Sequence, residues 1–342
     1  MEIFVFEFVT GGGFLGQEIP PPSLLAEGRA MLGALAADFG RLPQVRVTTT
    51  CDQRFPLPLP GCQVSEVATP AAWEQEFARL AGRAEWTVVI APEFDDLLYS
   101  SAARALAAGG RLLGPSPAWI ALAADKHRTA EALQATGVPV PAGIRLEQGQ
   151  LLPVRFAYPA VLKRVDGAGS LDVHSIRDAT AAGDYGPVPR ASRLERQVEG
   201  MPASVAVLCG PSGYQALAAG RQKISSDGRF SYQGGCLPLD AARARRARQL
   251  ALAAMTAVPG AVGYVGVDIV LGDDAAEDVV VEINPRLTTS YVGLRAAYRQ
   301  NLAQRMLELA CGGQPSEEEV TEQVDFDADG TVRCLGASGN VA

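Results

Sequence analysis

The segment VVVEINPR, residues 279–286, carries more structural information than any other stretch of this chain. Its apolar, β-branched start is typical of a strand inside a sheet. Because strand side chains alternate between faces, we expect Glu282 and Asn284 to point the same way and Ile283 to point to the other side. Two hard oxygen ligands on one strand face suit Mg²⁺. Pro285 should end the strand, which leaves Arg286 beside this predicted metal site.

A strand that ends in an ordinary polar turn could contain the same short motif. The rest of the chain must therefore distinguish a metal site from such a turn. The chain has 342 residues, of which 48% are hydrophobic and 20% are charged. This composition supports a packed core and argues against disorder. The length predicts two or three domains, or one large composite α/β unit.

Charge and cysteine content argue against several classes of protein. The formal net charge of −8 lacks the basic footprint of a nucleic-acid-binding protein. The six cysteines form no CxxC pair, so we expect no zinc cluster and a reduced, cytoplasmic compartment. The N-terminus shows no signal peptide, and no stretch reaches the roughly 18 apolar residues of a membrane span. We therefore expect neither nucleic acid nor a membrane as a partner.

Strands and helices alternate through the first third of the chain. The sequence predicts strands at residues 3–9, 45–49, 86–91 and 111–113, and helices at 23–38, 70–82 and 97–108. This order is typical of a parallel sheet with helices on its faces. We therefore expect an N-terminal α/β domain over residues 1–115.

The pattern changes after Pro115. A helix at 125–136 precedes strands expected at 161–163, 171–173, 193–198, 203–208 and 215–224. We then expect a helix at 240–258, adjacent strands at 264–271 and 279–283, and a last helix at 292–310. The acidic tail from Gly312 should lie at the surface or be loosely packed.

The first strand is followed by Gly11-Gly12-Gly13-Phe14-Leu15-Gly16, which satisfies the GxGxxG pattern of dinucleotide-binding proteins. In those proteins the last glycine opens a helix whose N-terminus meets the pyrophosphate. Here Pro20-Pro21-Pro22 intervenes, so a flexible substrate loop is the preferred interpretation. A nicotinamide oxidoreductase that uses Gly11–Gly16 is the rival hypothesis.

A second glycine-rich loop follows Lys163, which lies at the end of an apolar strand. Backbone amides in such a loop can approach phosphate oxygens, and a lysine on the neighbouring strand can neutralise them. A hairpin turn with a surface lysine is the alternative.

Asp268 lies in an apolar strand, VGVDIV at 265–270, that should pair with the Glu282 strand. A lone acid there must face solvent or find a partner, and two carboxylates held close together repel each other. An Mg²⁺ ion that bridges to ATP phosphates would satisfy Asp268, Glu282 and Asn284 together.

The order of these motifs resembles the ATP-grasp superfamily over residues 115–310. The matching features are Asp125-Lys126 at a helix start, Lys163 before its loop, the hinge-like strand ERQVEG at 195–200, Asp268, and EINPR at 282–286. The resemblance implies an α/β fold, α+β in the ATP-binding part. In this fold the N-terminal parallel α/β domain precedes a two-lobed ATP-grasp domain, with lobes at residues 116–198 and 199–342.

The resemblance also implies site residues. Those for the nucleotide are Lys126, Lys163, Gly167, Gly169, Ser170, Glu195, Gln197 and Val198. In this assignment the lysines contact phosphates, the glycine loop closes over them, and Glu195 meets the adenine amino group beside the hinge. The metal ligands for Mg²⁺, or alternatively Mn²⁺, are Asp268, Glu282 and Asn284. Arg286 would be catalytic, stabilising the transferring phosphoryl group.

Two positions depart from family patterns. Residues 200–204 offer no acid for the ribose, and Gly266 stands where D-alanine–D-alanine ligases carry arginine, which argues against that branch. The runs FVFEF at 4–8 and NPRLTTSY at 284–291 are similar to tyramine–glutamate ligases of methanofuran synthesis.

The resemblance implies an ATP-dependent carboxylate–amine ligase that works through an acyl phosphate, with small-molecule acid and amine substrates. Such catalysis is mainly positioning and charge stabilisation, which suits a chain with two histidines. We expect acceptor specificity in the Gly11–Gly16 loop and in residues 288–295. A different acid–amine pair and a non-catalytic ATP-binding module are the alternatives, and a homodimer is compatible with the sequence.

Overall fold

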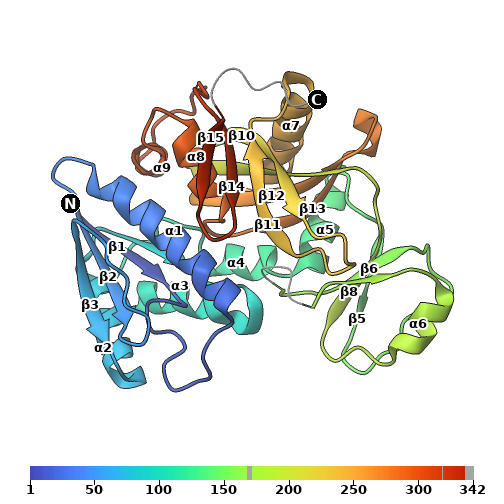
Figure 1. Ribbon diagram of the computed structural model, residues 1–342, viewed down its shortest axis with the longest axis horizontal. Helices are drawn as coiled ribbons and strands as arrows, with labels where there is room; N and C mark the ends of the chain where they lie inside the picture. Colours follow the sequence, from blue (N-terminus) through green and yellow to red (C-terminus); the bar gives the residue numbers. More distant parts are fainter. Residues whose placement is uncertain (168–171, 318, 336–342) are drawn as a thin grey trace.

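The computed structural model describes residues 1–167, 172–317 and 319–335, and these residues form three β-sheets. A parallel sheet lies in the N-terminal part, a small antiparallel sheet in the middle of the chain, and a larger antiparallel sheet in the C-terminal part (Figure 1). The predicted α/β class, with a parallel N-terminal domain, is confirmed. The expected boundaries at residues 115 and 198 stay a prediction.

The N-terminal sheet has the strand order β3-β2-β1-β4, and its strands are parallel. Alternation along β1 explains its layers: Ile3 and Val5 pack in the core with α1, whereas Phe4 and Phe6 pack with α2 and α3. The elements are β1 (Glu2–Glu7), α1 (Pro22–Gly40), β2 (Arg46–Asp52), β3 (Cys62–Val67), α2 (Pro70–Arg83), β4 (Trp86–Ile90), η1 (Phe94–Asp96) and α3 (Leu97–Ala107).

The sheet differs from the sequence prediction in two places. The strand β3 was not predicted, because its residues CQVSEV have the mixed polarity of a half-exposed edge strand rather than an apolar run. The strand expected at 111–113 is reduced to a single parallel bridge between Thr87 and Leu112. Gly114 and Pro115 follow at once, and proline cannot continue a hydrogen-bonded ladder.

The middle of the chain forms a small lobe around an antiparallel sheet of order β5-β8-β6-β7. The Asp125 carboxylate accepts hydrogen bonds from the N–H groups of His127 and Arg128 and so caps helix α5, close to the helix start that we predicted. The strand expected at 171–173 lies partly outside the described residues, and β7 follows it instead. The elements are α4 (Pro117–Ala123), α5 (Lys126–Ala135), β5 (Gly143–Leu146), β6 (Ala160–Arg164), β7 (His174–Ile176), α6 (Ala179–Tyr185) and β8 (Ser192–Arg196).

The C-terminal sheet has seven strands in the order β13-β12-β9-β10-β11-β14-β15. Helix α7 covers one face of the sheet, and α8 and α9 cover the other. The elements are β9 (Met201–Gly210), β10 (Gly213–Ile224), β11 (Tyr232–Leu237), α7 (Ala241–Ala257), β12 (Gly263–Leu271), η2 (Ala275–Glu277), β13 (Val279–Asn284), α8 (Ser290–Ala297), α9 (Leu302–Ala310), β14 (Gln323–Asp327) and β15 (Val332–Leu335). In the described part of the chain, no helix has the length and apolar character needed to cross a membrane.

Two further expectations are corrected here. The tail is not loosely packed, because β14 pairs with β11 and buries Val324 and Phe326 in the core. The single helix expected at 292–310 is two helices, α8 and α9. The backbone turns extended at Tyr298, and the Asn301 side chain accepts a hydrogen bond from the Gln304 N–H, which starts α9 afresh.

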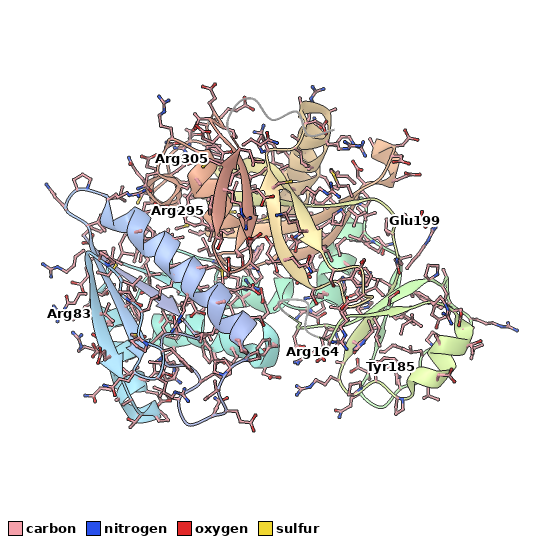
Figure 2. The ribbon with its side chains drawn as sticks, viewed as in Figure 1. Arg83, Arg164, Tyr185, Glu199, Arg295 and Arg305 are labelled. Atoms are coloured by element: carbon pink, nitrogen blue, oxygen red, sulfur yellow. The ribbon has the colours of Figure 1, made fainter. Side chains whose placement is uncertain are left out.

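An ion pair with a buried carboxylate joins α1 to α8, and therefore joins the N-terminal sheet to the C-terminal one. The Asp38 carboxylate is held by Arg295 through two hydrogen bonds of 2.9 and 2.6 Å and by the Tyr291 hydroxyl at 2.8 Å. Arg295 lies near the end of α1 (Figure 2). The exposed Arg41 adds a longer ion pair of 3.3 Å to the same carboxylate. This ion pair adds to the apolar packing of α1 against α8 and α9, which joins the two sheets in one core.

Replacing Arg295 by methionine should lower the free energy of unfolding by about 3 kcal/mol, because it leaves the Asp38 carboxylate buried without its main cation. The matched variant Arg41→Met removes an exposed partner of the same acid and should cost less than about 1 kcal/mol. Urea unfolding followed by circular dichroism measures both. Equal losses in the two variants would contradict this account of the ion pair.

Candidate active site

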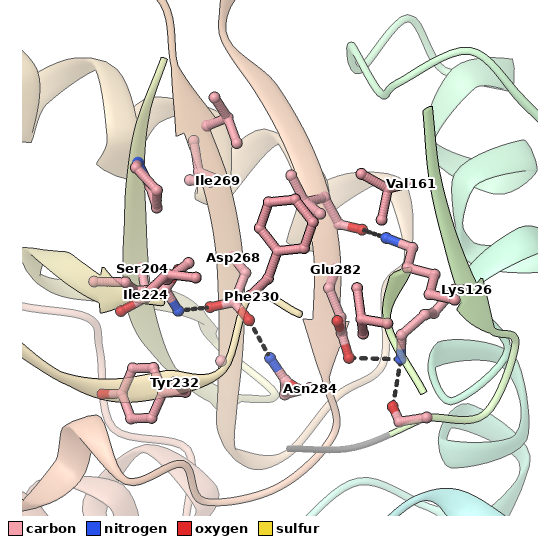
Figure 3. Close-up of a pocket in the computed structure, with 18 of the residues that line it drawn as sticks. Lys126, Val161, Ser204, Ile224, Phe230, Tyr232, Asp268, Ile269, Glu282 and Asn284 are labelled. Carbon is pink, nitrogen blue, oxygen red and sulfur yellow. Dashed lines mark hydrogen bonds and ion pairs between the residues drawn. The ribbon is translucent and has the colours of Figure 1, made fainter. Parts of the chain in front are cut away.

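A cavity of about 490 Å³ lies between the small lobe and the C-terminal sheet (Figure 3). Strands β6 and β8 provide one wall, and strands β9, β10, β12 and β13 provide the other. Of the predicted site residues that the structure describes, each lines this cavity: Lys126, Lys163, Gly167, Glu195, Gln197, Val198, Asp268, Glu282, Asn284 and Arg286. Gly169 and Ser170 lie outside the described residues.

The two predicted metal-binding acids face each other across neighbouring strands. Asp268 on β12 is the register partner of Glu282 on β13, as the sequence pairing predicts. The Asn284 side-chain amide donates a 3.0 Å hydrogen bond to Asp268, and the Gln222 amide donates one of 2.9 Å (Figure 3). Burial, followed by the neighbouring charge of Glu282, raises the pKa of Asp268 to about 7. A cation between these groups would remove the repulsion.

The donor set therefore fits a hard divalent cation, since it consists of two carboxylates and a carboxamide on one face of paired strands. Among the described residues, no three His, Cys, Asp or Glu side chains converge on one point. Protein ligands alone would thus leave coordination positions open, which is usual for Mg²⁺ bound together with phosphates.

Lys126 sits at the start of α5 and crosses to the acidic strand. Its side chain is buried, and its ammonium donates to Glu282 at 2.7 Å and to the Gly167 carbonyl oxygen (Figure 3). Gly167 opens the predicted phosphate loop, so this lysine connects that loop to the acidic strand. Its predicted contact with phosphate stays a prediction.

Lys163 and Glu195 form a buried ion pair across β6 and β8. Their charged atoms are 2.5 Å apart, and Arg193 contacts the same carboxylate at 2.7 Å. The lysine also donates to the Val281 carbonyl oxygen at 3.3 Å. The contact of Glu195 with adenine stays a prediction; in this structure its carboxylate holds Lys163 in place at the cavity wall.

Arg286 follows β13 and is bound by an acid from the N-terminal part of the chain. Its Nε lies 2.9 Å from Glu93, which follows β4, and both side chains are largely buried. Burial alone would lower the pKa of Arg286, but the charges of Glu93, Glu27 and Glu282 more than offset it and keep the guanidinium protonated. Arg286 is thus a fixed positive charge beside the acidic pair.

The Gly11–Gly16 loop is not the flexible substrate loop that we expected. Its first three glycines are buried, and none of the six residues lines the cavity in the described structure. A Cβ on Gly13 would lie 2.5 Å from the Phe8 ring, and Gly12 has a positive φ of 104°. These glycines permit close packing of a turn against aromatic side chains.

The cavity residues missed from the sequence include Glu27, Gln222 and Tyr232. Gln222 lies on the predicted strand 215–224, where alternation with Gly220 and Ile224 would have placed it on one face. Tyr232 belongs to β11, which was not predicted. Glu27 lies in a helix of the N-terminal domain, and nothing in the local pattern indicates that it reaches a cavity in another part of the chain.

Fold and cavity together define a nucleotide-binding protein of the ATP-grasp type. Residues 123–290 match the ATP-grasp domain family, and residues 45–120 match the pre ATP-grasp 3 domain. The chain belongs to the ATP-grasp superfamily.

Particular relatives lie within this superfamily. The chain is 25% identical to tyramine–L-glutamate ligase of Methanocaldococcus fervens over 328 residues, which is 94% of this chain and 97% of that protein. It is 23% identical to the enzyme of the same name from Methanocaldococcus jannaschii over 297 residues, covering 86% of this chain and 84% of the relative. A solved structure of a putative ATP-grasp superfamily protein from Archaeoglobus fulgidus superposes with a TM-score of 0.71, at 25% identity, over 95% of this chain and 92% of that chain.

Replacing Asp268 by asparagine should remove most of the thermal stabilisation that Mg²⁺ adds to ATP. A ligand that binds only the folded state raises the unfolding midpoint in proportion to its affinity, and this variant removes one charged oxygen ligand. Differential scanning fluorimetry with ATP, in Mg²⁺ or in EDTA, measures the metal-dependent part. The exposed neighbour variant Asp273→Asn should behave like the wild type; retention of the full metal effect in Asp268→Asn would refute the assignment.

Replacing Lys163 by methionine should raise the Kd for ATP at least about tenfold, since a charged contact with phosphate contributes about 1.4 kcal/mol or more. Lys223→Met is the control, because Lys223 pairs with Asp325 outside the cavity lining. Isothermal titration calorimetry compares the two variants. Unchanged ATP affinity in Lys163→Met would show that this lysine does not face the phosphates.

Proposed function

We propose that this protein is an ATP-dependent ligase that joins a carboxylate to an amine through an acyl phosphate. The observation that carries the proposal is the meeting of Asp268 and Glu282 in a cavity that also holds Lys126, Lys163 and Arg286. Two acids for a divalent cation beside three cationic side chains are suited to a triphosphate and to a second anion.

The finer assignment is that glutamate supplies the carboxylate and tyramine the amine. It is supported by the names of the two Methanocaldococcus relatives and by their coverage of nearly the whole chain. A role in the synthesis of a methanofuran-type cofactor would follow from that pair of substrates.

The reaction would take place in two displacements. The substrate carboxylate attacks the γ-phosphorus of ATP, and the bond to ADP breaks, which gives the acyl phosphate. The amine then attacks the acyl carbon, and the bond to phosphate breaks. Asp268, Glu282 and Asn284 would hold Mg²⁺, which when bound neutralises the phosphates and orients the γ-phosphoryl group.

The protein's own groups would act by charge and position. Lys126 and Lys163 are already fixed by ion pairs to Glu282 and Glu195, so they require little rearrangement when the phosphates arrive. Arg286 is fixed by Glu93 and would stabilise the charge that develops on the transferring phosphoryl group and on the tetrahedral intermediate.

ADP release should require ATP, Mg²⁺, an acid and an amine together. A coupled pyruvate kinase and lactate dehydrogenase assay, run with glutamate against aromatic and aliphatic amines, measures this requirement. An equal rate of ADP release with and without the amine would contradict the ligase proposal. Nucleotide binding without any turnover would favour the non-catalytic ATP-binding module, and turnover with other acids only would reject the glutamate assignment.

The double variant Arg286→Gln/Glu93→Gln should lower kcat by about 10²–10³, while the Kd for ATP stays within a few-fold. Changing both partners avoids leaving a buried charge unpaired, so the fold should persist. Steady-state kinetics and calorimetry on the same preparation separate the two effects. A wild-type kcat in the double variant would remove Arg286 from the mechanism.

A further inference from the structure

Glu27 reaches the cavity from outside the ATP-binding lobes. It lies on α1, and among the described lining residues it is the one that precedes residue 115. The neighbouring Gly28 packs directly on β1, where an added Cβ would lie 2.7 Å from the Glu7 carboxyl group. This close approach of helix to strand fixes Glu27 at the cavity wall, where it accepts a 3.2 Å hydrogen bond from the Thr289 hydroxyl.

The Glu27 carboxylate has no paired cation within the described structure. Of the five cationic side chains that line the cavity, Lys126, Lys163 and Arg286 are paired with other acids, at 2.7 Å to Glu282, 2.5 Å to Glu195 and 2.9 Å to Glu93. Arg164 is paired with Asp95 and Asp166, and Arg196 is exposed on β8. The adjacent Glu7, by contrast, is satisfied by Thr10, whose N–H and hydroxyl both donate to it. Glu27 therefore presents a negative charge to the cavity that its surroundings leave incompletely satisfied.

The surroundings of Glu27 also favour the protonated form of its carboxyl group. Burial raises the pKa of Glu27, and the charge of Arg286 and the Thr289 hydroxyl offset only part of that effect. The phenol of Tyr232 on β11, whose own pKa is raised well above its ordinary value, also interacts electrostatically with Glu27. A carboxylate in such a setting accepts a proton more readily than an exposed one.

We infer that Glu27 binds the amine substrate as its ammonium ion and takes the proton that frees the nucleophile. This inference rests on the proposed ligase function. R–NH₃⁺ gives one proton to the Glu27 carboxylate and becomes R–NH₂. The nitrogen then forms a bond to the acyl carbon, the carbon–oxygen bond to phosphate breaks with its electron pair, and the leaving phosphate takes the second proton. The Glu27 carboxyl group returns its proton to solvent.

The variant Glu27→Gln separates amine binding from acyl-phosphate formation. With ATP, Mg²⁺ and L-glutamate, hydroxylamine traps an acyl phosphate as the hydroxamate, and hydroxylamine is largely uncharged at neutral pH. We expect Glu27→Gln to form hydroxamate within about threefold of the wild-type rate. With tyramine, kcat/KM of the variant should fall at least about 100-fold. At pH values below the pKa of tyramine, kcat/KM of the variant should increase about tenfold for each unit by which the pH is raised, because the variant depends on the free amine present in solution.

The exposed acid Glu18, which precedes α1, provides the control variant Glu18→Gln, which should match the wild type in both assays. Thermal unfolding verifies that all three proteins are folded. Equal losses of hydroxamate and amide in Glu27→Gln, or an unchanged kcat/KM for tyramine, would overturn the inference and leave the ligase intact. Absence of hydroxamate from the wild-type protein would instead overturn the proposed function, and the inference with it.

Discussion

Asp268 and Glu282 occupy paired positions on β12 and β13, and both carboxylates are directed into the same cavity. Holding two like charges together in desolvated surroundings opposes folding unless other groups compensate. The neighbouring side chains supply that compensation in part: Lys126 neutralises Glu282, and the amides of Asn284 and Gln222 donate to Asp268. The residual negative charge favours the binding of a cation, and the pairing of the two strands holds both carboxylates in place before the cation arrives.

The N-terminal domain takes part in this site although its own sheet is far from the acidic pair in sequence. Glu93 holds Arg286 from the end of β4, and Glu27 reaches the cavity from α1. The Asp38–Arg295 ion pair fixes α1 against α8 and so sets the position from which Glu27 acts. The domain that precedes the nucleotide-binding lobes is thus a part of the active-site wall rather than a separate module.

Sequence patterns predicted the parts of the fold that depend on local signals. The β12–β13 pair, the Asp125 helix cap and the strand bearing Lys163 are where periodicity and capping residues indicate. Edge strand β3 and tail strands β14 and β15 were missed, because mixed polarity hides strands whose partners lie far away in sequence. Glu27 could not have been predicted for the same reason: its role arises from tertiary contacts, whereas Glu282 is marked by its own strand.

The tail strands have a consequence for the edge of the C-terminal sheet. Strand β14 hydrogen-bonds to β11 along four residue pairs from Gly234 to Leu237, and β15 then covers β14 with a short strand whose Arg333 pairs with Asp325. Without β14 and β15, the backbone N–H and C=O groups of β11 would form an open sheet edge, which is a template for pairing with a second molecule. The acidic, weakly patterned C-terminal segment therefore covers the sheet edge that β11 would otherwise expose.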